Sequence, residues 1–138
     1  MKLCFFLNFE PNPPTVTHQE KKVRVVNGRP MFYMPPELAN ARALLAAKLK
    51  PFAPPRPLDG PIHLGVSWAF TPPRSVRVKE PTWKTTKPDT DNLQKMLKDV
   101  MTECGFWKDD ALVCSETVEK IYHSPDEKHG ILILVRSL

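Results

Sequence analysis

Hydrophobic and polar positions follow three patterns along the chain. Residues 61–71 alternate apolar and other side chains, which is typical of a strand with one buried face. Residues 36–50 and 91–104 place apolar side chains three and four positions apart, which predicts two amphipathic helices. Other strands are expected in three short apolar segments: 3–9, 112–122 and 130–135.

Glycine and proline mark the boundaries between these elements. Asn27-Gly28 separates two short segments, 22–26 and 30–34, and this dipeptide favours a tight hairpin turn. Gly105 follows the second helix and can adopt the left-handed conformation that closes a helix. Fifteen of the 16 prolines lie between residues 11 and 88, so strands, turns and loops are expected to dominate the first two thirds of the chain.

The pattern as a whole predicts an α/β fold of the α+β type. A mixed β-sheet would carry two main helices, and 138 residues fit one domain over 1–138. No apolar segment approaches the roughly 20 residues that cross a bilayer, and no secretory signal begins the chain. Three cysteines without close pairing argue against a disulfide framework and against a zinc cluster. We therefore expect a cytoplasmic protein that does not enter the membrane.

Charge is divided unevenly along the chain. Residues 1–88 hold 14 Lys or Arg against 5 Asp or Glu, whereas residues 89–138 hold 6 against 10, so a net charge of +5 combines +9 with −4. A basic body favours a polyanionic partner, and nucleic acid is the leading candidate. Ordinary solvated Lys and Arg side chains are the alternative.

A basic, proline-containing loop is expected at about 71–88. Its length is unusual for a loop inside a compact domain, which points to a function. We expect the loop to follow DNA phosphates. Trp83 within it either stacks on or wedges between bases, or packs against its own domain. The candidate DNA-binding cations are Arg74, Arg77, Lys79, Lys84 and Lys87.

Two pairs of carboxylates flank the second helix. Asp89 and Asp91 lie where an extended segment enters the helix, and their oxygens could share one cation. Asp109 and Asp110 follow the helix. In an extended segment they would face opposite sides, and Asp110 is the favoured ligand. Because this set lacks His and Cys, the expected ion is Mg²⁺ or Mn²⁺ rather than zinc.

Each of these side chains also has a structural explanation. Asp91 followed by Gln94 resembles a capping box, and Asp109-Asp110 suits a turn. Lys95 lies four residues after Asp91, so it either forms an ion pair along the helix or faces substrate. Facing substrate, it would stabilise the charge on a scissile phosphate or, with a depressed pKa, help to activate water.

The ordered motif around the second helix is more specific than a lone Asp-x-Asp. The segment 87–95 reads Lys-Pro-Asp-x-Asp-Asn-Leu-x-Lys, and it is followed by Asp99, Gly105 and then Trp-x-Asp-Asp at 107–110. This arrangement resembles the RusA family of Holliday junction resolvases. The resemblance extends along the whole chain, with an N-terminal strand, a Pro-Pro turn, a basic middle and two closing strands.

The resemblance implies a RusA-like fold and a homodimeric, Mg²⁺-dependent endonuclease, bacterial or phage-encoded. Such an enzyme cuts four-way DNA junctions by paired symmetric nicks. The resemblance assigns catalysis and metal binding to Asp89, Asp91 and Asp110, with Lys95 as a functional lysine. Whether Asp109 is also a ligand is left open.

Two other functions fit the same residues. A basic module could bind branched DNA without cutting it, with the carboxylates serving only as caps and turns. A metal-dependent nuclease with a broader range of substrates could act on flaps or replication forks. The resolvase and the binding module both predict salt-sensitive DNA binding, but only the resolvase predicts Mg²⁺-dependent cleavage.

Overall fold

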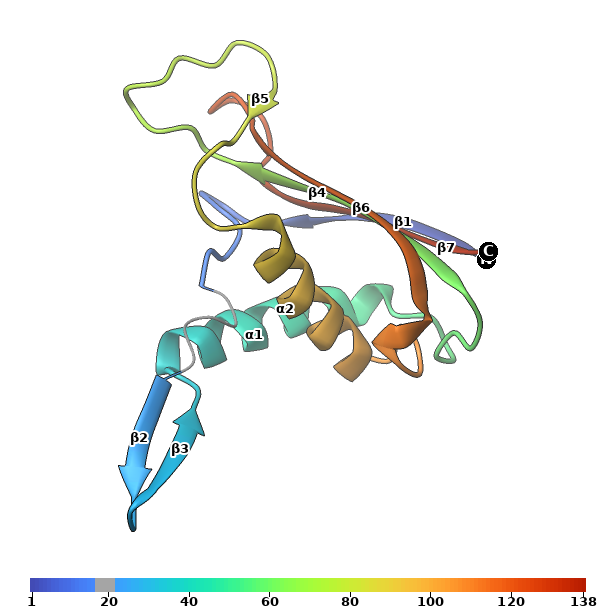
Figure 1. Ribbon diagram of the computed structural model, residues 1–138. Coiled ribbons are helices and arrows are strands. Elements are labelled where there is room, and N and C mark those ends of the chain that lie inside the picture. The colour runs from blue at the N-terminus through green and yellow to red at the C-terminus, as the bar shows by residue number, and fades with distance from the viewer. Residues whose placement is uncertain (17–21) are drawn as a thin grey trace.

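Five strands form one mixed sheet that carries both main helices on one face (Figure 1). The computed structural model describes residues 1–16 and 22–138. The elements are β1 (Lys2–Asn8), β2 (Lys22–Val26), β3 (Arg29–Tyr33), α1 (Pro36–Leu49), β4 (Ile62–Phe70), β5 (Thr82–Trp83), α2 (Thr90–Glu103), β6 (Val113–Tyr122) and β7 (Gly130–Ser137). The sheet order is β1-β7-β4-β6-β5, with β4 and β6 parallel and the other neighbours antiparallel. The predicted α+β fold with a mixed sheet and two helices is confirmed.

The hydrophobic core lies between the sheet and the two helices. Strand β4 alternates as predicted, and Leu64 and Trp68 on its inner face are fully buried. The apolar stripe of α2 packs against this face, and its members are 0 % exposed: Leu93, Met96, Leu97, Val100 and Met101. Burying side chains of this size stabilises the fold by about 1.5–3 kcal/mol each, which fixes the position of α2 on the sheet.

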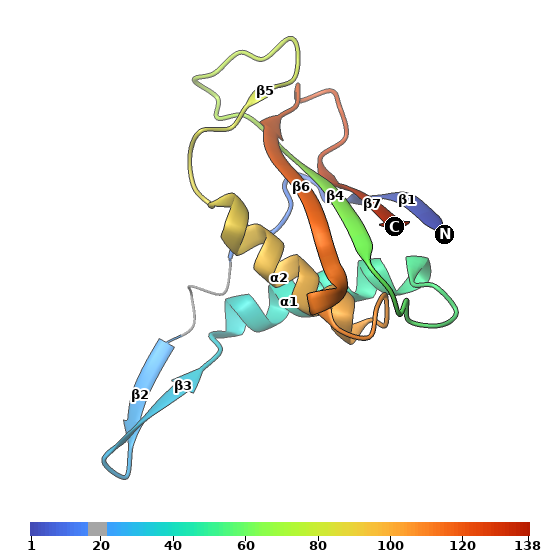
Figure 2. The ribbon, with the colours of Figure 1, turned by 45° about the vertical axis from the view of Figure 1, so that its right-hand side comes forward.

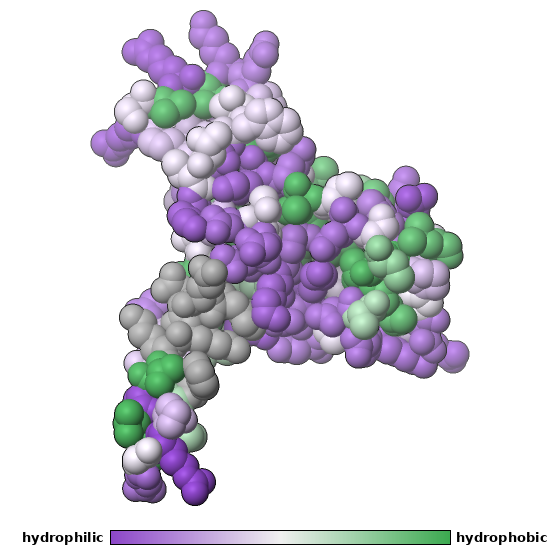
Figure 3. Space-filling view, viewed as in Figure 1, coloured by the Kyte–Doolittle hydropathy of each residue, from purple (hydrophilic) through white to green (hydrophobic). Residues whose placement is uncertain are grey.

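The β2–β3 hairpin projects away from the rest of the molecule (Figures 1 and 2). Asn27 and Gly28 form its turn with φ of 51° and 74°, as the sequence predicts. Apolar side chains of the hairpin, including Val25 at 72 % exposure, face solvent, and Figure 3 shows hydrophobic atoms gathered on this arm. Within the described part of the chain, no helix is long and apolar enough to cross a membrane.

The basic loop is more ordered at one point than the sequence predicts. Thr82 and Trp83 form the short strand β5, which pairs with β6 at Tyr122 and Ile121. The Trp83 side chain is nevertheless 67 % exposed. This exposure argues against packing of Trp83 on its own domain, and contact of Trp83 with a base stays a prediction.

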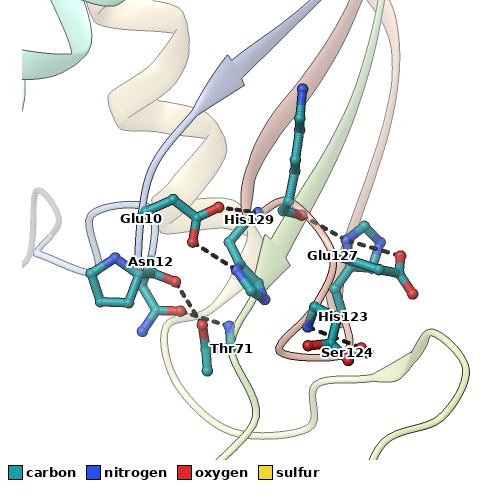
Figure 4. A network of polar contacts seen from close by, with 10 residues as sticks. Glu10, Asn12, Thr71, His123, Ser124, Glu127 and His129 are labelled. Atoms are coloured by element: carbon teal, nitrogen blue, oxygen red, sulfur yellow. Dashed lines mark hydrogen bonds and ion pairs between the residues drawn. The ribbon is translucent and has the colours of Figure 1, made fainter.

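A polar network ties the base of this loop to the ends of the sheet (Figure 4). The Glu10 carboxylate accepts a hydrogen bond of 3.0 Å from the backbone N–H of His129, and its second oxygen lies 3.0 Å from His129 Nδ1. Asn12 accepts a 2.7 Å hydrogen bond from the backbone N–H of Thr71, where the loop begins. The network therefore fixes the base of the loop to the segment that follows β1.

Glu10→Gln is expected to destabilise the protein at neutral pH and not at low pH. The backbone and side-chain hydrogen bonds from His129 hold the pKa of Glu10 below its ordinary value of 4.5. A lowered carboxyl pKa stabilises the folded state above the ordinary pKa, and this contribution is lost as the pH falls through the lowered value. Urea unfolding between pH 3 and 7 measures it. Glu80→Gln, on the exposed loop, is the control, and an unchanging difference across the range would contradict the expectation.

Candidate active site at the start of helix α2

Helix α2 begins before Asp91, earlier than a capping box at that residue would require. Asp89 is the N-cap residue, with φ −76° and ψ 148°, and its side chain makes no capping hydrogen bond. Asp91 already lies inside the first helical turn. The capping-box alternative is therefore wrong. The carboxylate of Asp91 is available for another role, and the helix N-terminus favours a negative charge there.

One cavity of about 410 Å³ brings residues from three separate segments together. Asp91 and Lys95 lie on one face of α2 because residues four positions apart are neighbours on a helix. Asp110 comes from the short 3₁₀ helix Asp110–Leu112 that precedes β6. The polar residues around the cavity are Thr90, Asp91, Gln94, Lys95, Lys98, Asp110 and Glu116. Three of the four predicted catalytic residues thus line a single space.

Asp89 is the predicted catalytic residue that does not line this cavity. Its carboxylate accepts a 2.8 Å hydrogen bond from Lys87 Nζ, and the two side chains are 45 % and 80 % exposed. An ion pair this exposed contributes little to stability, so either partner can exchange it for another. The role of Asp89 in metal binding stays a prediction.

The two acidic residues after the helix differ in what they contact. Asp109 Oδ1 accepts a 2.8 Å hydrogen bond from the backbone N–H of Ala111, which caps the short 3₁₀ helix. Asp109 lines a second cavity together with Asp99 and Glu103. Asp110 lines both cavities. The turn interpretation therefore describes Asp109, whereas Asp110 remains the favoured ligand.

Lys95 does not form the ion pair that helical spacing allows. In the residues that the structure describes, its side chain makes no hydrogen bond or ion pair with Asp91 or with any other group, and it is exposed to solvent at the cavity. The alternative in which Lys95 faces substrate is the one that this placement favours.

Lys120 supports the segment that leads into α2, and sequence reasoning missed it. Its Nζ donates hydrogen bonds of 2.5 Å to the carbonyl of Thr86 and 2.8 Å to the carbonyl of Pro88. Burial lowers the pKa of Lys120, and the charge of Lys84 lowers it further. Lys120 thus holds in place the segment that leads to Asp89.

Glu116 is a second residue that sequence reasoning missed. It lies on the same face of β6 as Val118 and Lys120, the face directed toward α2, and it pairs in register with buried Leu64. A charged residue at an inward position of an alternating strand is the signal that could have identified both Glu116 and Lys120.

The predicted DNA-binding cations have different surroundings. Arg74, Arg77 and Lys79 are exposed on the loop, and Figure 3 shows strongly hydrophilic side chains projecting from this part of the molecule. Lys84 is half-buried at the base of the loop, with Nζ 5.1 Å from the ring centre of Tyr122 and 5.3 Å from that of Phe70.

The lowered pKa of Tyr122 reflects the positive charges at the base of the loop. A hydrogen bond with Thr86 and a second one from Lys84 lower the pKa of the Tyr122 hydroxyl, and the charges of Lys84 and Lys120 act in the same direction. This region therefore favours an anionic group.

The donor set of the cavity fits a hydrated hard cation. Among the described residues, no three His, Cys, Asp or Glu side chains lie close enough to hold one ion between them. Asp91, Asp110 and Glu116 nevertheless line one space together with the amide of Gln94, whose Oε1 is buried and has no hydrogen-bond partner in the described chain. Mg²⁺ retains several waters and binds through one or two carboxylates plus substrate phosphates, so these donors suit it.

An open cavity with acidic donors beside a basic loop suits the class of enzymes that cut nucleic acids. The family model described as endodeoxyribonuclease RusA matches residues 11–134. A crossover junction endodeoxyribonuclease RusA of Lactococcus phage r1t is 30 % identical over 129 residues, which cover 94 % of this chain and 95 % of the phage protein. The chain belongs to the RusA family, as the motif around α2 indicates.

Proposed function

We propose that this protein is a metal-dependent, structure-selective endodeoxyribonuclease that resolves four-way (Holliday) junctions by paired nicks in phosphodiester bonds. The observation that carries the proposal is the single cavity lined by Asp91, Lys95 and Asp110 beside the basic loop. Family membership and the phage relative, whose name states crossover junction cleavage, support the reaction. The proposal includes an intracellular location, because the DNA on which the enzyme would act lies inside the cell.

The four predicted catalytic residues have separate roles in the proposed hydrolysis of a phosphodiester. Asp91 and Asp110 would hold Mg²⁺, or Mn²⁺ in its place. Asp89 is the third acidic residue in this proposal, and it can turn toward the ion when Lys87 binds a phosphate instead. The ion, when bound, supplies a Lewis acid for the scissile phosphate and favours deprotonation of the attacking water. Lys95 would stabilise the negative charge that develops on the nonbridging oxygens.

Metal dependence is tested by cleavage of a synthetic four-way junction in Mg²⁺, in Mn²⁺ and in EDTA, with a linear duplex of the same sequence beside it. We expect cleavage of the junction in either metal and none in EDTA. Binding of the junction without cleavage under every metal condition would instead favour the non-catalytic binding module. Equal cleavage of the linear duplex, or preferred cleavage of flaps and forks, would favour the broader nuclease.

The exposed cations of the loop are expected to set the salt dependence of DNA binding. The triple variant Arg74→Gln, Arg77→Gln and Lys79→Gln should reduce the slope of log K against log salt by about 0.9 for each phosphate that the loop no longer neutralises. Fluorescence anisotropy of a labelled junction at several salt concentrations measures the slope. The control replaces three exposed cations outside the loop, Lys2, Arg56 and Arg136, with Gln. Equal slopes for both triple variants would contradict a DNA-binding role for the loop.

A homodimer also belongs to the proposal. A four-way junction has near two-fold symmetry, and two nicks at symmetric positions require two active sites related by a two-fold axis. Light scattering of the purified protein should therefore give twice the chain mass of 15.8 kDa. A monomer that resolves junctions would contradict this part of the proposal.

A further inference from the structure

The amide of Gln94 leaves one buried oxygen without a donor. The residue is 3 % exposed and lines the cavity of the active site. Its Nε2 donates a hydrogen bond of 3.2 Å to Glu116 Oε2. Because a carboxylate paired with a lysine accepts and does not donate, the nitrogen of the amide must face Glu116. Oε1 therefore points elsewhere, and in the described chain no group donates to it.

Glu116 links this amide to the rest of the cavity. Its Oε1 lies 3.3 Å from Lys98 Nζ, and its side chain is 37 % exposed. Strand β6 places it on the face that also carries Val118, and both residues line the cavity that holds Asp91 and Asp110. Glu116 is thus a third carboxylate of the space in which the proposed cation binds.

The spacing of these carboxylates suits contact through water. No three acidic side chains in the described chain are close enough to touch one ion directly. A partly hydrated Mg²⁺ presents water hydrogens at a greater radius, and these hydrogens need acceptors. A buried oxygen that lacks a donor is the kind of group that ordered water satisfies.

We propose that Glu116 and Gln94 are positioning residues that accept hydrogen bonds from the waters around the divalent cation. Residues that contact a metal through its ligands orient those ligands and raise metal affinity. Gln94 acts through Oε1. Glu116 acts through its charge and by fixing the orientation of the Gln94 amide through the hydrogen bond from Nε2. This inference rests on the proposed metal dependence of the enzyme.

The test measures Mn²⁺ binding to the full chain without DNA, by the loss of the free Mn²⁺ electron paramagnetic resonance signal. Glu116→Gln should weaken binding by about 10- to 100-fold, and Gln94→Met should weaken it in the same direction. The matched control is Glu119→Gln, which removes the same charge from the same strand. Glu119 accepts a 2.9 Å hydrogen bond from Ser67 on the opposite face of the sheet. Its variant should bind Mn²⁺ as the wild type does.

Cleavage as a function of metal concentration distinguishes a positioning role from a loss of structure. Glu116→Gln should need more Mn²⁺ for half-maximal cleavage and should regain most of the wild-type rate at saturation. The half-exposed Glu116 can be replaced without disturbing the core, so this variant keeps the test decisive even when Gln94→Met fails to fold. Equal Mn²⁺ affinity in Glu116→Gln and Glu119→Gln would overturn the inference and leave the proposed function intact. A wild type that neither binds Mn²⁺ nor cleaves junctions would overturn the proposed function as well.

Discussion

Asp91→Asn is expected to abolish cleavage of four-way junctions while junction binding is retained or becomes tighter. Asp91 lines the cavity with Asp110 and Lys95, and its side chain makes no hydrogen bond or ion pair within the described residues. The substitution keeps the shape of the side chain and removes one oxygen of the proposed metal site and one negative charge. In the proposed mechanism the cation would stabilise the transition state by several kcal/mol, and without the Asp91 carboxylate it would bind too weakly to act, so the rate should fall by about 10³-fold or more.

Binding should not suffer, because a carboxylate near DNA repels phosphates and its removal eases their approach. Gel shift and cleavage assays on the same labelled junction measure both effects. Asp126→Asn, in the exposed turn between β6 and β7, is the control for the removal of one charge. Cleavage by Asp91→Asn at the wild-type rate would contradict the assignment of the site.

Gly130→Ala is expected to destabilise the sheet strongly. Gly130 begins β7 opposite Asn8 of β1 and has a φ of +154°. A Cβ atom built there would lie 1.9 Å from the carbonyl oxygen of Leu7 and 2.9 Å from Phe6 Cζ. The oxygen belongs to the backbone of the paired strand, so relief requires that β1 and β7 separate. The free energy of unfolding should fall by about 3 kcal/mol or more.

Two other glycines are matched controls for this substitution. A Cβ atom at Gly60 meets nothing within 4 Å and φ is not positive there, so Gly60→Ala should leave stability nearly unchanged. Gly28 has the same free space but a φ of +74°, so Gly28→Ala isolates the backbone strain alone, about 1 kcal/mol. Urea unfolding of the three variants measures their free energies of unfolding, which should rise from Gly130→Ala through Gly28→Ala to Gly60→Ala. Similar stability of Gly130→Ala and Gly60→Ala would contradict the close packing of β1 against β7.

Local pattern is sufficient to predict most of the elements. The period-2 alternation of β4 and the apolar stripe of α2 each follow from which side chains must face the core, and both predictions agree with the structure within one or two residues. Asn27-Gly28 defines its own turn because few other dipeptides adopt its φ values. The order of the strands and the parallel pairing of β4 with β6 depend on contacts distant in sequence, which no local pattern encodes.

The candidate site is predictable where chemistry and helical spacing coincide. Asp91 and Lys95 share a helix face by spacing, and Asp110 joins them only through the turn that follows α2. Glu116 and Lys120 are not predicted because charged residues on a strand ordinarily face solvent, whereas the sheet places both on the side of α2. Asp89 is close to Asp91 in sequence, yet its carboxylate pairs with Lys87 and does not line the cavity.

Mapping the nicks on all four strands of one synthetic mobile junction tests the proposed function most directly. Each strand is labelled in turn, and the products are resolved beside a linear duplex that carries the same sequence. Two active sites related by a two-fold axis predict nicks at symmetric positions in two opposed strands, in the presence of Mg²⁺, with the linear duplex intact. Nicks scattered over all strands, or equal cleavage of the linear duplex, would contradict a junction-resolving enzyme.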